Sequence, residues 1–198
     1  RVGVLDSGFY PVSDIDYAGG YNLSALSGDY GPEYLESEVD PSCTDAHGTA
    51  VAGIIGATAN NGVGIAGILD AELVATRVLS CNTGFLSDTA LGIRWLAGDP
   101  SVTEAPPLAQ PVDIINASLG SQTSSCPFYL QDAIDYAYQK GILVVVAAGN
   151  DSIDASGFTP ANCENVMTVG AVDKSGRPSS FSNYGDSVDV AALGSLVT

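Results

Sequence analysis

Three polar residues of this chain, Asp6, His47 and Asn150, occupy sequence contexts suited to catalysis. Asp6 ends the apolar segment VGVLD, His47 opens the small-residue segment HGTAVAGIIGA, and Asn150 closes the apolar segment VVVAAGN. A carboxylate can orient an imidazole, the imidazole can act as a general base, and a side-chain amide can donate a hydrogen bond to an oxyanion. These residue types therefore suit nucleophilic attack on a carbonyl group, if the fold brings them together.

Each of these residues also has an ordinary structural interpretation. His47 is the only histidine, and a lone histidine is more often structural than catalytic. An Asp after a strand is often a turn or cap residue, and an Asn can simply turn the chain out of a strand. The three contexts, taken together in this order along the chain, favour the catalytic interpretation. Placing His47 at the start of a helix of small residues would also fix its ring.

The elements that must position these residues follow an alternating pattern of apolar strands and helices. Such alternation predicts an α/β fold of three layers, a parallel sheet with helices on both faces. Active sites in such sheets gather at the carboxyl ends of the strands, where Asp6, Ser118 and Asn150 fall. The predicted strands are residues 2–5, 73–78, 114–118, 143–147, 166–171 and 188–191, and the predicted helices are residues 47–56, 89–96 and 128–140.

Two long stretches interrupt the alternation. Residues 20–46 are polar and acidic, and residues 98–112 are rich in proline, so both are predicted to be irregular surface loops. The sequence contains no internal repeat and no break that would indicate a second domain. Residues 1–198 are therefore expected to form one domain, and with 45% hydrophobic and 15% charged residues they suit a compact globular protein.

The charge balance excludes several classes of partner. Acidic residues number 23 against 6 basic ones, a formal net charge of −17. Such a chain is not expected to bind nucleic acid or an anionic membrane surface. No segment approaches the roughly 20 apolar residues of a membrane span. No signal-peptide pattern is present and Arg1 leads directly into a strand, so the chain is expected to be a processed, mature piece.

The contexts of Asp6, His47 and Asn150 resemble those of the subtilisin-like serine peptidases (subtilases), whose catalytic residues occur in the order Asp, His, Ser. The resemblance covers essentially all 198 residues and stops before the Gly-Thr-Ser-Met-Ala segment that carries the family's serine. It implies that Asp6 orients the imidazole, that His47 is the base and that Asn150 stabilises the oxyanion. It also implies a peptide-binding cleft bordered by Ser118, Leu119, Gly120, Ala148 and Gly149.

The sequence gives only a weak indication of substrate specificity. Asp151 and Asp154 follow the predicted oxyanion residue and would lie next to the pocket for the residue before the scissile bond. They could favour a basic residue there, or they could simply be solvated.

The four cysteines, Cys43, Cys81, Cys126 and Cys163, allow three disulfide pairings and form no C-x-x-C motif. Disulfides in an oxidising compartment are therefore more expected than a zinc or dithiol site. Within the subtilases, the segments RVLSCNTG and FTPANCENVMTVGAVD most resemble extracellular proteases of Gram-negative bacteria. That resemblance implies a secreted protein with the pairs Cys43–Cys81 and Cys126–Cys163.

A calcium site is also implied by the resemblance, because TANNGVGI (58–65) has the length and residues of the family's calcium loop. Oxygen-only ligation of this kind suits calcium. The alternative is that Asn-Asn-Gly forms a plain turn, and the family's amino-terminal ligand is absent here. The expected ligands are the Asp14 carboxylate, the Asn61 side-chain oxygen and the carbonyls of Thr58, Val63 and Ile65, and Asp189 is a weaker candidate for a second site.

The leading hypothesis is a secreted serine endopeptidase whose serine lies on a companion polypeptide from the same precursor and whose substrates are proteins or peptides. Ser118 and Ser182 lack the strand–turn–helix setting of the family's nucleophile. One alternative is an inactive, truncated subtilase fold that acts as a binding or regulatory module. Another is a secreted calcium-binding adhesive domain, which would explain the acidity but none of the three contexts.

Overall fold

A computed structural model describes residues 1–27, 30–31, 46–81 and 83–195. Its centre is a seven-stranded sheet in the order β11-β10-β8-β6-β1-β3-β2, in which every neighbouring pair is parallel. The strands are β1 (Val2–Asp6), β2 (Tyr17–Asn22), β3 (Leu73–Arg77), β6 (Ile114–Ala117), β8 (Leu143–Ala147), β10 (Val166–Val172) and β11 (Val190–Leu193).

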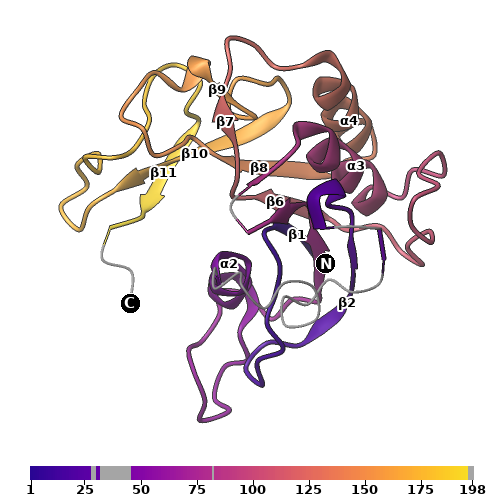
Figure 1. The fold of residues 1–198 in the computed structure, drawn as a ribbon. Coiled ribbons are helices and arrows are strands. Elements are labelled where there is room, and N and C mark those ends of the chain that lie inside the picture. Colours follow the sequence, from indigo (N-terminus) through magenta and orange to yellow (C-terminus); the bar gives the residue numbers. More distant parts are fainter. Residues whose placement is uncertain (28–29, 32–45, 82, 196–198) are drawn as a thin grey trace.

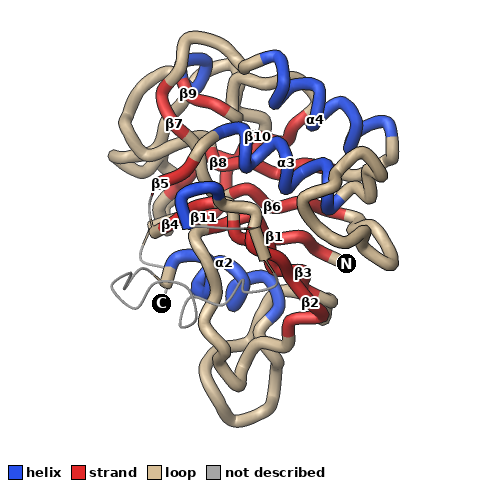
Figure 2. Tube along the Cα trace, turned by 45° about the vertical axis from the view of Figure 1, so that its right-hand side comes forward, coloured by secondary structure: helices blue, strands red, loops and turns tan. Residues whose placement is uncertain are grey.

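Helices lie on both faces of this sheet, so the predicted three-layer α/β fold is confirmed. Helix α2 (His47–Gly56) lies on one side, and α3 (Leu86–Leu96) and α4 (Phe128–Gln139) lie on the other (Figures 1 and 2). No helix within the described ranges is both long and apolar enough to span a bilayer. Two short 3-10 helices are η1 (Ala25–Ser27) and η2 (Ala155–Gly157). Four two-residue strands form two antiparallel pairs. Strand β4 (Leu79–Ser80) pairs with β5 (Thr83–Gly84), and β7 (Ser121–Gln122) pairs with β9 (Phe158–Thr159).

Alternation along β1 determines which way Asp6 points. Val2 and Val4 belong to the apolar cluster that includes Ala52 of α2, whereas Leu5 belongs to the larger cluster under α3 and α4. Successive side chains of a strand point to opposite faces. Asp6 therefore shares the α2 face with Val2 and Val4, at the carboxyl end of a fully buried strand.

The main core fills the space between the sheet and helices α3 and α4. Its members are apolar side chains that the surrounding elements exclude from water. This burial of apolar surface is the chief favourable contribution to folding. They include Ile93 and Leu96 of α3, Leu130 and Ile134 of α4, and Ile115, Val144 and Val146 of the sheet.

The opposite face of β8, β10 and β11 is also apolar, but no helix in the described part of the chain covers it. In-register pairing places the side chains of these strands side by side, and the exposed fractions of Leu143 and Val190 are 37% and 46%. We call this surface the open sheet face; it consists of Leu143, Val145, Ala147, Met167, Val169, Ala171, Val190 and Ala192.

One expectation about the loops is wrong. Residues 20–46 were expected to be irregular, but residues 20–22 complete strand β2, which pairs with β3 at the sheet edge after a register shift between Tyr17 and Gly19. The segment YAGGYN lacks β-branched residues, so pairing with β3 decides its structure. Residues 98–112 contain no helix or strand, as predicted, and Trp95 Nε1 donates a hydrogen bond of 2.7 Å to the Pro106 carbonyl within them.

Candidate active site

Asp6 and His47 meet at the carboxyl end of β1. His47 Nδ1 lies 2.7 Å from Asp6 Oδ1, and the same oxygen accepts hydrogen bonds from the Ser7 backbone N–H at 2.7 Å and the Ser7 hydroxyl at 3.2 Å. The side-chain exposure is 1% for Asp6 and 49% for His47. The carboxylate is thus shielded from water, while the imidazole that it holds reaches the surface.

The first turn of α2 is seated directly on the loop that follows Asp6. A Cβ at Gly48 would collide with the Gly8 carbonyl oxygen and would lie 3.0 Å from Asp6 Cβ. The next residue, Thr49, accepts a hydrogen bond of 2.8 Å from the Tyr10 backbone N–H. The small residue after His47 therefore allows the helix to approach β1 closely enough for the Asp6–His47 bond.

The segments after β6 and β8 lie beside each other at the same sheet edge, because the two strands pair with Ala117 opposite Val146. Phe158 links them: a Cβ at Gly120 would collide with its ring, and a Cβ at Gly149 would lie 3.0 Å from it. Glycine at both positions therefore makes room for the Phe158 side chain between the two segments, and Phe158 is 8% exposed.

The remaining residues of these two segments have the following surroundings. The Ser118 hydroxyl accepts a hydrogen bond of 3.0 Å from Asn116 Nδ2, and Ala148 is buried. Leu119 is 9% exposed and lines a cavity of about 180 Å³ together with Leu79 and Phe85.

Asn150 is exposed and follows Gly149, whose φ of +103° suits glycine. Strand β8 lies two positions from β1 in the sheet, which corresponds to a lateral separation of about 10 Å. The structure thus places Asn150 on the same edge as Asp6 and His47. Thr49, Phe158 and Asn183 have no local signature in the sequence, because each acts through a contact with a distant segment.

The two acidic residues after Asn150 differ in their surroundings. Asp154 caps η2: its carboxylate accepts a hydrogen bond of 2.9 Å from the Ser156 backbone N–H, and this bond lowers the pKa of Asp154. Asp151 is exposed, and its backbone N–H donates to Asn183 Oδ1 at 2.9 Å. Asp154 is therefore ionised at neutral pH and bound in a local turn.

The predicted calcium loop closes around Asp14. Asp14 Oδ1 accepts a bond of 2.7 Å from Asn61 Nδ2, and Oδ2 accepts one of 2.9 Å from the Ile65 backbone N–H. Asn61 Oδ1 accepts from the Val63 N–H at 2.9 Å, and the Thr58 N–H donates to the Asp14 carbonyl at 2.8 Å. Within the described ranges, no group of three His, Cys, Asp or Glu residues is placed to hold a metal.

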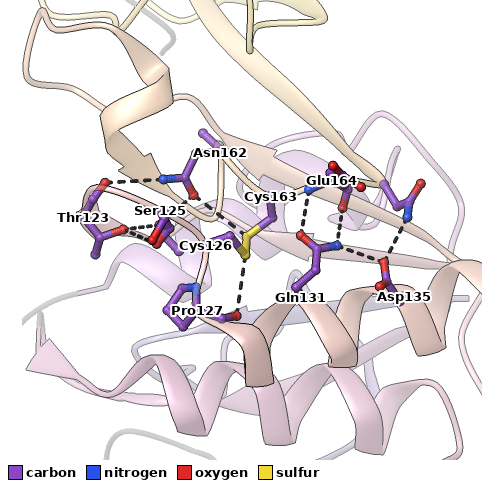
Figure 3. The surroundings of a disulfide bond; sticks show 12 residues. Thr123, Ser125, Cys126, Pro127, Gln131, Asp135, Asn162, Cys163 and Glu164 are labelled. Carbon is purple, nitrogen blue, oxygen red and sulfur yellow. Dashed lines mark hydrogen bonds between the residues drawn. A yellow bond between two sulfur atoms is a disulfide. The ribbon is translucent and has the colours of Figure 1, made fainter.

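The disulfide Cys126–Cys163, which the resemblance implies, is present and joins residues 37 positions apart (Figure 3). Beside it, Gln131 Nε2 donates to the Glu164 carbonyl at 3.0 Å, and the Glu164 N–H donates to Gln131 Oε1 at 2.8 Å. These links fasten the segment after β9 to α4. Cys43 lies outside the described residues, so the Cys43–Cys81 pair stays a prediction.

The fold and the Asp–His pair define a subtilisin-like serine peptidase, and the family comparison agrees. A family model described as the subtilase family matches residues 1–198, so the chain belongs to that family. It is 40% identical to an extracellular protease of Xanthomonas campestris pv. campestris over 197 residues, which cover 96% of this chain and 34% of that protein. It is 41% identical to an extracellular basic protease of Dichelobacter nodosus over 152 residues, 76% of this chain and 25% of that protein.

Solved structures give the same result. A protease from Pseudoalteromonas arctica superposes with a TM-score of 0.89 at 37% identity, covering 98% of this chain and 62% of that one. A cold-adapted subtilisin-like serine proteinase superposes with a TM-score of 0.73 at 29% identity, covering 99% of this chain and 63% of that one. The chain spans 34% and 25% of the length of the two curated relatives named above.

Proposed function

We propose that this chain is the larger catalytic part of an extracellular serine endopeptidase of the subtilisin type. The observation that carries the proposal is the 2.7 Å contact between His47 Nδ1 and the buried Asp6 carboxylate. With Nδ1 held in this way, His47 Nε2 accepts the proton of the attacking serine and returns it to the leaving amine. Asp6 stabilises the imidazolium that forms between these two steps.

The oxyanion of the tetrahedral intermediate would be held by the Asn150 amide together with a backbone N–H. The substrate is a protein or peptide in extended form. Its backbone would lie between residues 118–120 and 148–149, adding a strand by hydrogen bonding to the main chain of these two segments. The extracellular location rests on the names of the relatives and on the disulfide.

We place the serine on a companion polypeptide from the same precursor. The open sheet face supports this placement. A contiguous apolar surface on a secreted protein normally marks an interface, and this one borders the carboxyl ends of β8 and β10 beside the candidate site. The competing function, an inactive binding module, would need neither the buried Asp6–His47 pair nor Asn150.

The surface that binds the companion can be tested with two exposed hydrophobic residues. Val190→Asp places a charge on the open sheet face, and Tyr129→Asp places one at a position of similar exposure on α4, across the sheet, 46% against 47%. If the companion covers the face, gel filtration should show its loss from the Val190→Asp variant and its retention by the Tyr129→Asp variant. Equal retention by both variants would show that the companion does not bind the open sheet face.

The function itself is tested by peptide hydrolysis with Asp6→Asn. The carboxamide preserves the shape of the side chain but favours the wrong imidazole tautomer, so kcat should fall by about 10⁴-fold. A protein that cleaves peptides equally well after this substitution does not use the proposed triad. A protein that binds peptides but never cleaves them, with the serine polypeptide present, would favour the binding module.

Calcium is the proposed structural cofactor of the loop around Asp14. A half-turn of the Asn61 amide would bring its oxygen beside the Asp14 carboxylate, giving the all-oxygen donor set that calcium prefers. When bound, the ion would neutralise the buried charge of Asp14 and tie residues 58–65 to the loop before β2. It would stabilise the fold and take no part in the hydrolysis.

A further inference from the structure

We propose that Asn183 is a positioning residue that fixes the oxyanion donor Asn150. The inference deepens the proposed function and rests on it, because it takes Asn150 as the oxyanion donor. Asn183 lies between β10 and β11, 30 to 35 residues along the chain from its partners in the turn that follows β8, and four hydrogen bonds nevertheless join it to that turn.

The four bonds hold the main chain on both sides of Asn150. Before it, Asn183 Nδ2 donates to the Ala148 carbonyl at 2.8 Å and the Asn183 backbone N–H donates to the Gly149 carbonyl at 3.0 Å. After it, Asn183 Oδ1 accepts from the Asp151 N–H at 2.9 Å and from the Ile153 N–H at 3.1 Å. The peptide units that flank Asn150 are therefore fixed by one residue: the backbone N–H of Asn183 holds the unit before Asn150, and its side-chain oxygen holds the unit after it.

This arrangement needs an amide. A side chain here must donate at one end and accept at the other, and Asn does both in a fixed plane whereas ionised Asp only accepts. Asn183 is 2% exposed, so an unmade bond would leave a buried polar group without compensation. Position 149 must also be glycine, because a Cβ there would collide with Asn183 Nδ2.

The direction of the Asn150 side chain depends on this support. Asn150 is exposed, and within the described ranges its own side chain makes no hydrogen bond that would orient it. An oxyanion donor works only if it is held in place before the charge develops, since a donor that must reorganise stabilises the transition state less. The Asn183 segment is itself anchored, because the Tyr184 N–H donates to the Ile153 carbonyl at 3.0 Å.

A double-mutant cycle separates positioning from general stability. Asn183→Asp should lower kcat about 10- to 100-fold with little change in KM, because the oxyanion forms only in the transition state. Asn150→Ala should lower kcat about 10²- to 10³-fold, the loss measured for such a donor in a subtilisin. If Asn183 acts through Asn150, adding Asn183→Asp to Asn150→Ala should cost less than about twofold more.

The cycle is measured on the assembled protease, with rates divided by the concentration of titrated active sites. Asn22→Asp is the matched control: Asn22 is also 2% exposed, but it binds the Ser24 N–H at the far edge of the sheet, so its kcat should stay unchanged. Asn183→Ser replaces Asn183→Asp if the latter does not assemble.

Equal losses from the Asn183 substitution in both backgrounds would overturn the proposal and leave Asn183 a structural residue. A normal kcat for Asn150→Ala would instead contradict the proposed function, because Asn150 would then not be the donor. The two failures are therefore distinct.

Discussion

At the scale of single residues, the contrast in exposure between Asp6 and His47 explains how the pair can work. The Asp6 carboxylate is shielded from water and receives three hydrogen bonds through one oxygen. A charge in such surroundings interacts strongly with its neighbour, because little solvent screens it. The imidazole, half exposed, can still receive a proton from a group arriving at the surface.

Two glycines of α2 give a matched test of how closely the helix must approach β1. Gly48→Ala should lower the melting temperature and the catalytic rate together, because its Cβ would collide with the Gly8 carbonyl and push His47 away from Asp6. Gly53→Ala should raise stability by about 0.5–1 kcal/mol, since its Cβ would lie 3.6 Å from Ile15 and Ile65 and alanine is the better helix former. Thermal unfolding and kcat of both variants check this; a harmless Gly48→Ala would contradict the close approach.

Residues with a local signature were predictable, and those defined by distant contacts were not. Asp6 could be identified because it ends an apolar run before Ser7 and Gly8, and His47 because it opens a segment of small residues. Nothing in the segment FSNYG around Asn183 indicates a role, since its four bonds reach residues 30 to 35 positions away along the chain. Phe158 is likewise positioned by a distant contact, the pairing of β7 with β9.

At the scale of elements, the first turn of α3 contains a buried carboxylate, Asp88, that lowers the stability of the fold at neutral pH. Asp88 is 3% exposed, and burial raises its pKa even though the Ala25 N–H donates to it at 2.8 Å. A raised folded-state pKa means that the folded protein binds the proton more tightly than the unfolded one. Stability is therefore lost as the pH rises from the unfolded value, about 3.9, through the folded value.

Asp88→Asn should accordingly raise the melting temperature at pH 7, with the gain vanishing as the pH falls below the carboxyl range. Asp173→Asn is the control of opposite sign: the Ser175 hydroxyl and nearby backbone N–H groups lower the pKa of Asp173. Its contribution is present above the unfolded pKa and is lost as the pH falls through the folded one, so this variant should be less stable at pH 7. Melting curves of both variants across this pH range test the two predictions. A destabilised Asp88→Asn variant at pH 7 would show that burial of the Asp88 carboxylate does not lower stability.

The loop of residues 58–65 should make stability depend on calcium. An ion bound only by the folded state at 100 times its Kd adds about 2.7 kcal/mol, so saturating calcium should raise the melting temperature by roughly 5–10 °C. Asp14→Asn should abolish the difference, because it removes the one carboxylate that the loop surrounds. An unchanged melting temperature when EDTA is added to the calcium-loaded protein would refute the site.

Element prediction succeeded where hydrophobic periodicity was strong. Helix α2 has the expected bounds, and α4 ends one residue earlier than expected. Strand β2 was missed because its glycine-rich sequence has no β pattern, and β7 and β9 because two-residue strands have no periodicity to detect. These elements exist through pairing with a neighbour, which a local pattern does not contain.

At the scale of the whole molecule, the sheet is covered unevenly in the part of the chain that the structure describes. Helices α3 and α4 bury one face, whereas α2 lies over β1 and leaves the open sheet face on the same side. The companion polypeptide proposed for that face would therefore complete the core and the triad together. Both predicted disulfides would use up the four cysteines, so no covalent link to the companion is expected.

The most direct measurement of this account is labelling of the purified protease with a fluorophosphonate, followed by denaturing electrophoresis without reductant. The label should appear on a separate, smaller polypeptide and not on this chain, and His47→Ala should abolish it, because the base that activates the serine lies here. Label on the 198-residue chain itself, or labelling that survives the loss of His47, would contradict a serine peptidase whose triad is divided between two polypeptides.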